Sequence, residues 1–346
     1  MHALALASAA VAALVLATPL SAADATAQPL YRQVKEVPLG APDRWDYVVF
    51  DPAAERVYIA HGDRVTVVDP AKGMVIGNVE GMPGGTHGIA FADGKGYTDD
   101  GKAGTVTVFD LKTLKAIKTV KAEPDADGIA FEPVSGHIFV IDGDSGKLTV
   151  IDPKNDTVVA TIDAGGGLEF GLSGENGKFY VDGAEKGEIV RVDTKTNKAD
   201  AHWPMAGCVK PHGLAIDRQT HRLFSSCANK TMFVVNAENG AVVAKLPIGE
   251  GTDFAEFDPV RRWALSSNRD GTLSIIAEKS PERFEARPPV TTAYGARTMA
   301  LDPKTGRVYL VTADFEATPS ATDARQRYKA KPGSTKLLIL EPIDQK

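Results

Sequence analysis

The feature that most constrains this 346-residue chain is an internal repeat of about forty-two residues. A short apolar phrase that mostly ends in Asp or Asn returns along the chain and closes at positions 69, 110, 152, 193, 236 and 277. These positions are 41, 42, 41, 43 and 41 residues apart. A seventh copy closes at Glu341, and a polar insertion over residues 315–334 accounts for its later position. The chain is therefore built by repetition of one structural unit.

Each repeat has room for four short strands. A second phrase opens every repeat and occurs seven times, first at 46–52 and last at 297–303. A third apolar run, such as 56–59, lies between the two phrases, and a fourth, such as 157–162, follows them. Their alternating pattern is typical of half-buried strands. Four strands at a period near forty predict an all-β fold, a seven-bladed β-propeller with four-stranded antiparallel blades.

The two ends of the repeat array predict how the ring closes. The seventh repeat ends near Glu341 without a fourth strand, whereas residues 34–39 form a strand-like run that belongs to no repeat. We expect a closing strand over residues 31–40 to supply the outer strand of blade 7. Closure of this kind removes open sheet edges that would otherwise template aggregation. The mature chain, residues 26–346, is thus expected to be a single domain.

Residues 1–25 have the pattern of a secretory signal peptide. An apolar stretch covers 3–16, and small residues offer cleavage after Ala23 or Ala25. The stretch is shorter than the roughly 20 residues that a membrane span needs. We therefore predict a protein that is periplasmic or secreted and does not span the membrane.

Charge limits the partners of the chain. It has 45 acidic and 39 basic side chains, which give a formal net charge of -6, and its basic residues do not cluster. Binding to phosphate backbones needs a basic face. We expect no nucleic-acid partner, and we expect a monomer.

The repeat phrases resemble a known family. The third-strand phrase that ends in Asp-Pro, as at 65–70 and 148–153, and the segment 208–215 resemble the YVTN-repeat, YncE-like family of exported bacterial seven-bladed propellers. The resemblance covers essentially the whole mature chain and implies the fold. It implies less about function, because propellers host binding proteins, lactonases, oxidoreductase subunits and scaffolds on the same frame. The chain has no Cys-x-x-Cys-His motif, which excludes the haem-carrying relatives.

Equivalent positions of the repeats form a ring around the channel of a propeller, because every innermost strand starts at the same face. The residue that opens the first strand is ionisable in all seven repeats, and these residues are Asp46, His87, Asp127, Glu169, His212, Asp253 and Arg297. Four carboxylates, two imidazoles and one guanidinium at a narrow mouth suit a cation or a polar ligand. The alternative is a hydrated polar mouth without a ligand, because strand ends and turns favour polar residues. His61, further out, is expected at the surface.

Four of these residues are candidate metal ligands. His87 and His212, from repeats 2 and 5, should face each other nearly across the channel, with Asp127 and Glu169 between them. Two imidazoles and two carboxylates suit zinc, iron or manganese better than calcium. Without an ion, the crowded carboxylates would repel one another, and at least one is expected to hold a proton. A divalent metal is the cofactor that this pattern indicates.

The chain has two cysteines, Cys208 and Cys227. By repeat phase, Cys208 enters blade 5 and Cys227 ends the second strand of that blade, so antiparallel pairing brings both to the ring face. An oxidising compartment would join them in a disulfide. The rival prediction is that both thiolates join His212 in a soft metal site.

The sequence supports three functions. The leading hypothesis is an exported scaffold that binds a small-molecule ligand or a periplasmic protein through the channel face. The second is a metal-dependent hydrolase, lyase or isomerase with its ion in the ring. The third is a subunit of a periplasmic redox system. No Gly-x-Ser-x-Gly nucleophile motif or other recognisable catalytic set occurs, so the first is preferred.

Overall fold

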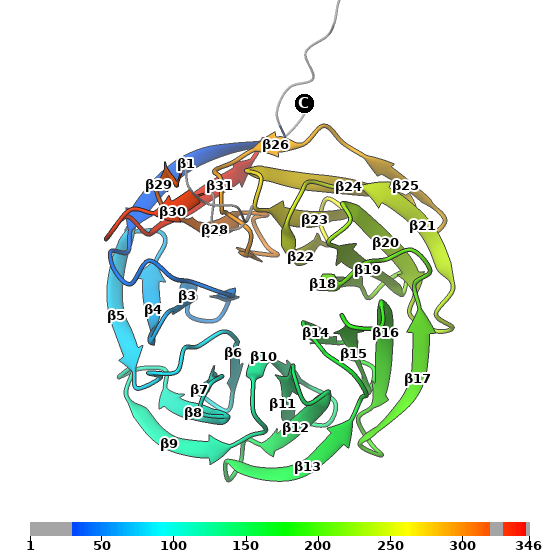
Figure 1. Ribbon diagram of the computed structural model, residues 1–346, viewed down its shortest axis with the longest axis horizontal. Helices are drawn as coiled ribbons and strands as arrows, with labels where there is room; N and C mark the ends of the chain where they lie inside the picture. The colour runs from blue at the N-terminus through cyan, green and yellow to red at the C-terminus, as the bar shows by residue number, and fades with distance from the viewer. Residues whose placement is uncertain (1–29, 319–327, 344–346) are drawn as a thin grey trace, which may run out of the picture.

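The computed structural model describes residues 30–318 and 328–343. The predicted signal peptide, residues 1–25, lies outside the described residues. Within them, the strands form seven blades arranged in a ring around a central channel, and no helix is present (Figure 1). The prediction of an all-β, seven-bladed propeller is confirmed.

Each of the first six blades is a meander of four antiparallel strands in chain order from the channel outward. Blade 1 comprises β2 (Val48–Asp51), β3 (Arg56–His61), β4 (Arg64–Asp69) and β5 (Met74–Glu80). Blade 2 comprises β6 (Ile89–Ala92), β7 (Lys95–Asp100), β8 (Thr105–Asp110) and β9 (Ala116–Lys121). Blade 3 comprises β10 (Ala126–Glu132), β11 (His137–Asp142), β12 (Lys147–Asp152) and β13 (Thr157–Asp163). Blade 4 comprises β14 (Gly171–Ser173), β15 (Lys178–Gly183), β16 (Glu188–Asp193) and β17 (Lys198–Pro204). Blade 5 comprises β18 (Pro211–Asp217), β19 (Arg222–Cys227), β20 (Thr231–Asn236) and β21 (Val242–Pro247). Blade 6 comprises β22 (Thr252–Asp258), β23 (Trp263–Asn268), β24 (Thr272–Ser280) and β25 (Arg283–Ala286), and the short β26 (Val290–Thr291) also pairs with β24.

Burial explains the sequence pattern of the strands. The two middle strands of a blade lie between neighbouring blades on both faces, so a strand such as β11 is buried at five of its six positions and has four apolar residues at its centre. The outer strands face solvent on one side, and β13 accordingly exposes most of its residues. Each blade buries its faces only against its neighbours, which is why the fold requires a complete ring.

Blade 7 joins the two ends of the chain. It contains β27 (Met299–Leu301), β28 (Val308–Thr312), β31 (Lys336–Pro342) and, outermost, β1 (Tyr31–Pro38). β1 pairs antiparallel with β31 from Tyr31 opposite Pro342 to Pro38 opposite Lys336. The prediction that an N-terminal strand closes the ring is confirmed.

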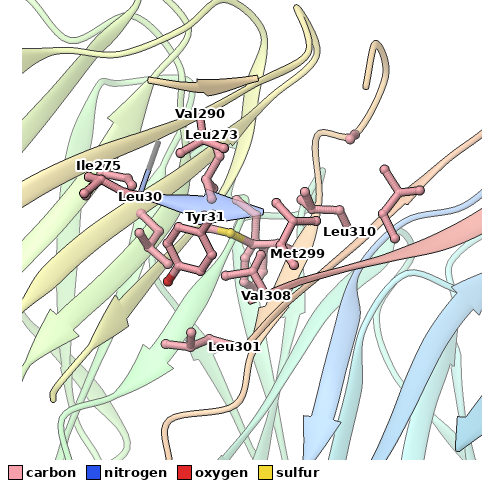
Figure 2. Close-up of a cluster of buried hydrophobic side chains, with 14 of the residues drawn as sticks. Leu30, Tyr31, Leu273, Ile275, Val290, Met299, Leu301, Val308 and Leu310 are labelled. Atoms are coloured by element: carbon pink, nitrogen blue, oxygen red, sulfur yellow. The ribbon is translucent and has the colours of Figure 1, made fainter. Parts of the chain in front are cut away.

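The closing strand also contributes to the core. Leu30 and Tyr31 are buried in a cluster between blades 6 and 7, where Figure 2 shows them among Leu273, Ile275, Val290, Met299, Leu301, Val308 and Leu310. The centroid of the Tyr31 phenol ring lies 6.2 Å from that of the Trp263 indole. Closure therefore combines a strand pairing with the burial of two large apolar side chains.

The inserted residues 315–334 lie between β28 and β31. They begin with β29 (Phe315–Ala317), which pairs with β30 (Tyr328–Ala330) in a separate two-stranded sheet. Trp45 packs edge-on against Phe315, with ring centroids 6.3 Å apart. Trp45 precedes the first ring residue, so this contact places the base of the insertion beside the channel mouth. No helix within the described ranges is long and apolar enough to cross a membrane.

Candidate functional site

The structure places all seven predicted ring residues at one end of the channel. Each lies at the start of an innermost strand or one to two residues before it, and their side chains are between 16 and 29% exposed. They are thus partly removed from water yet still open to the channel. We call them the channel ring: Asp46, His87, Asp127, Glu169, His212, Asp253 and Arg297.

Neighbouring members of the channel ring contact one another in two groups. In the larger group, the Arg297 guanidinium forms a short ion pair with Asp253 and lies 4.0 Å from Asp46. His212 Nδ1 lies 3.9 Å from Asp253 and 3.3 Å from Glu169, so this group crosses five blades. In the smaller group, His87 Nδ1 lies 3.9 Å from Asp127. In both groups a carboxylate side chain alternates with a nitrogen-bearing one.

A second carboxylate lies beneath His87. Asp99, near the end of β7, is fully buried, and its Oδ2 lies 2.7 Å from His87 Nδ1. Its Oδ1 accepts the backbone N–H groups of His87 and Gly88. Burial opposes the charged imidazole, but the Asp99 hydrogen bond and the negative charges of Asp99 and Asp127 outweigh it and raise the His87 pKa to about 9. His87 is therefore a cation at neutral pH.

The carboxylates of the ring are crowded. Burial, and next the charge of Asp46, raise the pKa of Asp127 well above its ordinary value. Burial likewise raises the pKa of the fully buried Asp182, whose Oδ1 accepts a hydrogen bond from Ser225 and whose Oδ2 has no partner among the described residues. Both shifts favour the protonated form of the carboxyl group.

Three aromatic rings close the channel directly below the channel ring. Tyr47, Phe170 and Phe254 each follow a channel-ring residue, in blades 1, 4 and 6. The aromatic centroid of Tyr47 lies 5.4 Å from that of Phe170 and 5.3 Å from that of Phe254, and the centroids of Phe170 and Phe254 are 4.6 Å apart. We call these three side chains the aromatic plug. Its apolar atoms form the floor beneath the ionisable groups, which removes water from one side of them.

Glycine occupies the equivalent position in blades 2, 3 and 5, at Gly88, Gly128 and Gly213. A Cβ on Gly213 would lie 2.5 Å from the backbone nitrogen of Ala255 in blade 6, which no real structure tolerates. A Cβ on Gly88 would meet the nitrogen of Ile129 in the next blade at the same distance. Innermost strands therefore approach closely at these positions, while the large rings of the other blades fill the axis.

The four predicted metal ligands form two pairs. His87 lies near Asp127 and His212 near Glu169, and Asp99 occupies the Nδ1 side of His87. Across residues 30–318 and 328–343, no three His, Cys, Asp or Glu side chains are grouped as metal ligands. As arranged, the four donors do not meet at one point, and binding of one ion by all four would require the two pairs to converge.

The two cysteines form the predicted disulfide. Cys208 and Cys227 are bonded, with their Cα atoms 5.6 Å apart. Cys227 pairs in register with Pro211, the residue before His212, so the bridge braces the start of the innermost strand of blade 5. The structure favours this bridge over the rival thiolate site.

One expectation about the ring face is wrong. His61 is only 1% exposed, and its Nδ1 lies 2.9 Å from the Thr66 hydroxyl. The segment that leads from the closing strand into blade 1 packs against this loop, and a Cβ on Gly62 would lie 2.6 Å from the Pro42 side chain. Repeat phase alone could not predict this cover, because the segment lies outside the repeats.

Sequence reasoning missed the aromatic plug and one further carboxylate, Glu256. Both had a signal in the repeat alignment. The residue after each ring position is aromatic or glycine in six of seven repeats, and Glu256 stands where every other repeat has Val, Ala or Leu.

Comparisons with known proteins support the fold. No protein-family model matches the chain. The uncharacterized protein YncE of Salmonella typhimurium is 27% identical over 145 residues, which is 40% of this chain and 40% of that protein. The chain thus matches about two fifths of the length of this curated relative. Together with the seven-bladed ring, the match confirms the resemblance to YncE-like propellers.

Solved structures show the same architecture at low identity. A chain of Kuenenia stuttgartiensis hydrazine synthase is 15% identical with a TM-score of 0.68, covering 78% of this chain and 92% of that one. A chain of the mitotic checkpoint complex is 13% identical with a TM-score of 0.73, covering 97 and 99%. The RRP9 WD40 repeats are 9% identical with a TM-score of 0.72, covering 91 and 97%. At these identities the likeness concerns the fold alone.

Proposed function

We propose that this chain is an exported β-propeller that binds a positively charged ligand, free or as part of a protein partner, at the channel ring. The observation that carries the proposal is the gathering of four partly exposed carboxylates at a channel mouth that holds one guanidinium. Export is proposed from the signal-like residues 1–25, and the ring supplies the binding chemistry.

The charge balance of the ring favours a cation. Arg297 is engaged by Asp253, and His87 is engaged by Asp99 beneath it. Asp46 and Asp127 then lie 4.0 and 3.9 Å from these two cations, and Glu169 lies beside the His212 imidazole. A guanidinium or ammonium group inserted among them would lower the elevated pKa of Asp127 and relieve the mutual repulsion of the carboxylates.

The floor of the ring limits the depth of such a ligand. The aromatic plug lies one residue below the ring along the strands, so a charged group can reach the carboxylates while an attached body remains outside. This geometry suits a side chain from a protein partner as well as a small molecule. It also places the cation over aromatic rings, an arrangement that is attractive in itself.

The test is calorimetric titration with argininamide, a small guanidinium-bearing cation. We expect binding that weakens as salt is added, because screening reduces charge attraction. The double variant Asp127→Asn, Glu169→Gln should bind argininamide at least about tenfold more weakly than the wild type. Glu285→Gln, which removes an exposed outer-strand carboxylate, is the matched control. Equal affinity in all three proteins, or preference for an anion, contradicts the proposal.

A metal-dependent function is a second candidate because each of the two ring pairs offers one nitrogen and one oxygen donor. Elemental analysis of protein prepared without chelator or added metal tests it. Stoichiometric zinc, iron or manganese that is lost in a His87→Ala, His212→Ala variant would favour this candidate. Equal traces in both proteins would leave the cation-binding function.

A further inference from the structure

We propose that the channel holds a second binding site, on the far side of the aromatic plug from the channel ring, for a small organic ammonium ion that carries an apolar group. The site is a cavity of about 490 Å³ that extends along the innermost strands from the plug. This volume lies in the range of small-molecule sites.

The walls of the cavity are mainly aromatic and aliphatic. Tyr47, Phe170 and Phe254 form its inner end, and Phe50, Phe91 and Phe131 line it from blades 1, 2 and 3. Such a wall favours an apolar body by desolvation, and aromatic faces attract a cation. The cavity is thus suited to a ligand that has both parts.

Glu256 supplies the charge in this wall. It lies in β22, at a strand position that holds Val, Ala or Leu in the other six blades. No described side chain forms a hydrogen bond or ion pair with its carboxyl group, whose interactions are an attraction to Arg218 and a contact with the backbone N–H of Phe257. Burial raises its pKa to about 7. A carboxyl group held in an apolar cavity without a side-chain partner is costly unless a ligand compensates it.

The rim of the cavity does not oppose a cation. The two other charged residues in the lining, Glu175 and Arg218, form an ion pair at 3.0 Å with about half of each side chain exposed. Arg218 also donates to the Ser173 carbonyl. Because the rim pair is neutral overall, ionised Glu256 sets a net negative charge inside the cavity.

The plug makes the two sites independent. Tyr47, Phe170 and Phe254 each follow a channel-ring residue in the chain, whereas Glu256 lies two residues beyond Phe254 on the cavity side. A ligand in the cavity therefore does not touch the carboxylates of the channel ring, and Tyr47 is the titratable side chain that borders both sites.

The test compares phenethylammonium with 2-phenylethanol, which has a similar shape and no charge, by calorimetric titration near pH 8. At the cavity we expect phenethylammonium to bind about tenfold or more tighter than the alcohol. Glu256→Gln should remove this preference and leave alcohol binding unchanged. Glu169→Gln, which alters only the channel ring, should leave the preference for the cation over the alcohol at the cavity unchanged.

Two measurements keep the outcome clear. Glu256→Gln should unfold at a higher temperature than the wild type near pH 8, because it removes a desolvated charge. In the wild type, phenethylammonium should bind more tightly near pH 8 than near pH 6, because Glu256 ionises between these values. The other titratable groups of the cavity lining are Tyr47, Glu175 and Arg218.

Equal affinities for the cation and the alcohol, or an unchanged preference in Glu256→Gln, would overturn the second site. Loss of phenethylammonium binding in Glu169→Gln alone would also overturn it and assign the cation to the channel ring. Failure of argininamide to bind, with this site intact, would instead affect only the function proposed for the ring.

Discussion

His87 and Asp99 form an ion pair at the channel mouth, with His87 Nδ1 2.7 Å from the carboxylate Oδ2 of a fully buried Asp99. Burial raises the Asp99 pKa to about 6, and His87 limits that rise. Because the His87 pKa is about 9, both partners are charged between roughly pH 6 and 9. The imidazole is thereby held as a cation and oriented toward Asp127.

Asp99→Asn should bring the His87 pKa down from about 9 toward its ordinary value, since the buried negative charge is lost. The native wild type binds the His87 proton more tightly than the unfolded chain does. Its stabilisation is therefore present below pH 6.5 and lost as pH rises through about 9. The variant should lose this alkaline decline. NMR titration of the His87 ring and unfolding free energies across pH measure both effects.

The control for this prediction is Asp63→Asn. Asp63 pairs with Arg64 on the same face at 2.7 Å, but its side chain is 52% exposed. An exposed pair contributes little, so the titration of His87 should not change. If Asp99→Asn also left that titration unchanged, the ion pair would be refuted.

The second prediction concerns ring closure. Tyr31→Ala should lower the free energy of unfolding by about 3 to 5 kcal/mol, because it empties a large buried side chain from the cluster between blades 6 and 7. Tyr31→Phe should be neutral or stabilising, because the buried Tyr31 hydroxyl has no hydrogen-bond partner among the described residues. Gln33→Ala, at an exposed position of β1, is the surface control. Denaturant titration ranks the three variants, and an unperturbed Tyr31→Ala would argue against closure by β1.

Removal of the whole closing strand should have a different consequence. Deletion of residues 31–38 leaves β31 as an open edge, and such edges pair with other chains. We expect the truncated protein to associate, measured by size-exclusion chromatography with light scattering. Monomeric elution with an unchanged unfolding midpoint would contradict this expectation.

The third prediction concerns the disulfide. The bridge spans 19 residues, and the chain-entropy relation for a loop of this size gives about 3 kcal/mol of stabilisation. Reduced protein should therefore have a lower free energy of unfolding than oxidised protein by about that amount. Thiol titration of the denatured, unreduced chain should find no free thiol, and two free thiols would exclude the bridge.

The fourth prediction tests the close approach of the innermost strands. Gly213→Ala should destabilise the fold by about 1 to 3 kcal/mol, because the new methyl group meets the rigid backbone of Phe254 and Ala255. Gly128→Ala is the matched control in blade 3, where the nearest atom is the Cδ1 of Ile141, at 2.9 Å on a side chain that can move. Thermal unfolding should separate the two variants, and equal midpoints would show that the blades can move apart.

Sequence reasoning reached the blade count, the closing strand and the membership of the channel ring. It succeeded because equivalent positions of a repeat must occupy equivalent places in a closed ring, so Asp46 and Arg297 can be placed together although 251 positions separate them. It failed at His61, whose cover comes from a segment without repeat symmetry. It also passed over Glu256, because one departure from an apolar repeat position does not reveal what the side chain faces.

The contacts inside the channel depend on side chains from blades that are distant in the chain. Repeat phase placed Asp127 and Glu169 on one arc between two histidines, but it did not show that each carboxylate lies beside the neighbouring imidazole. The aromatic plug likewise exists only because rings from blades 1, 4 and 6 meet on the axis. Periodicity determines where a residue stands in the ring, because backbone geometry repeats; which partner it faces depends on the size and charge of neighbours that do not repeat.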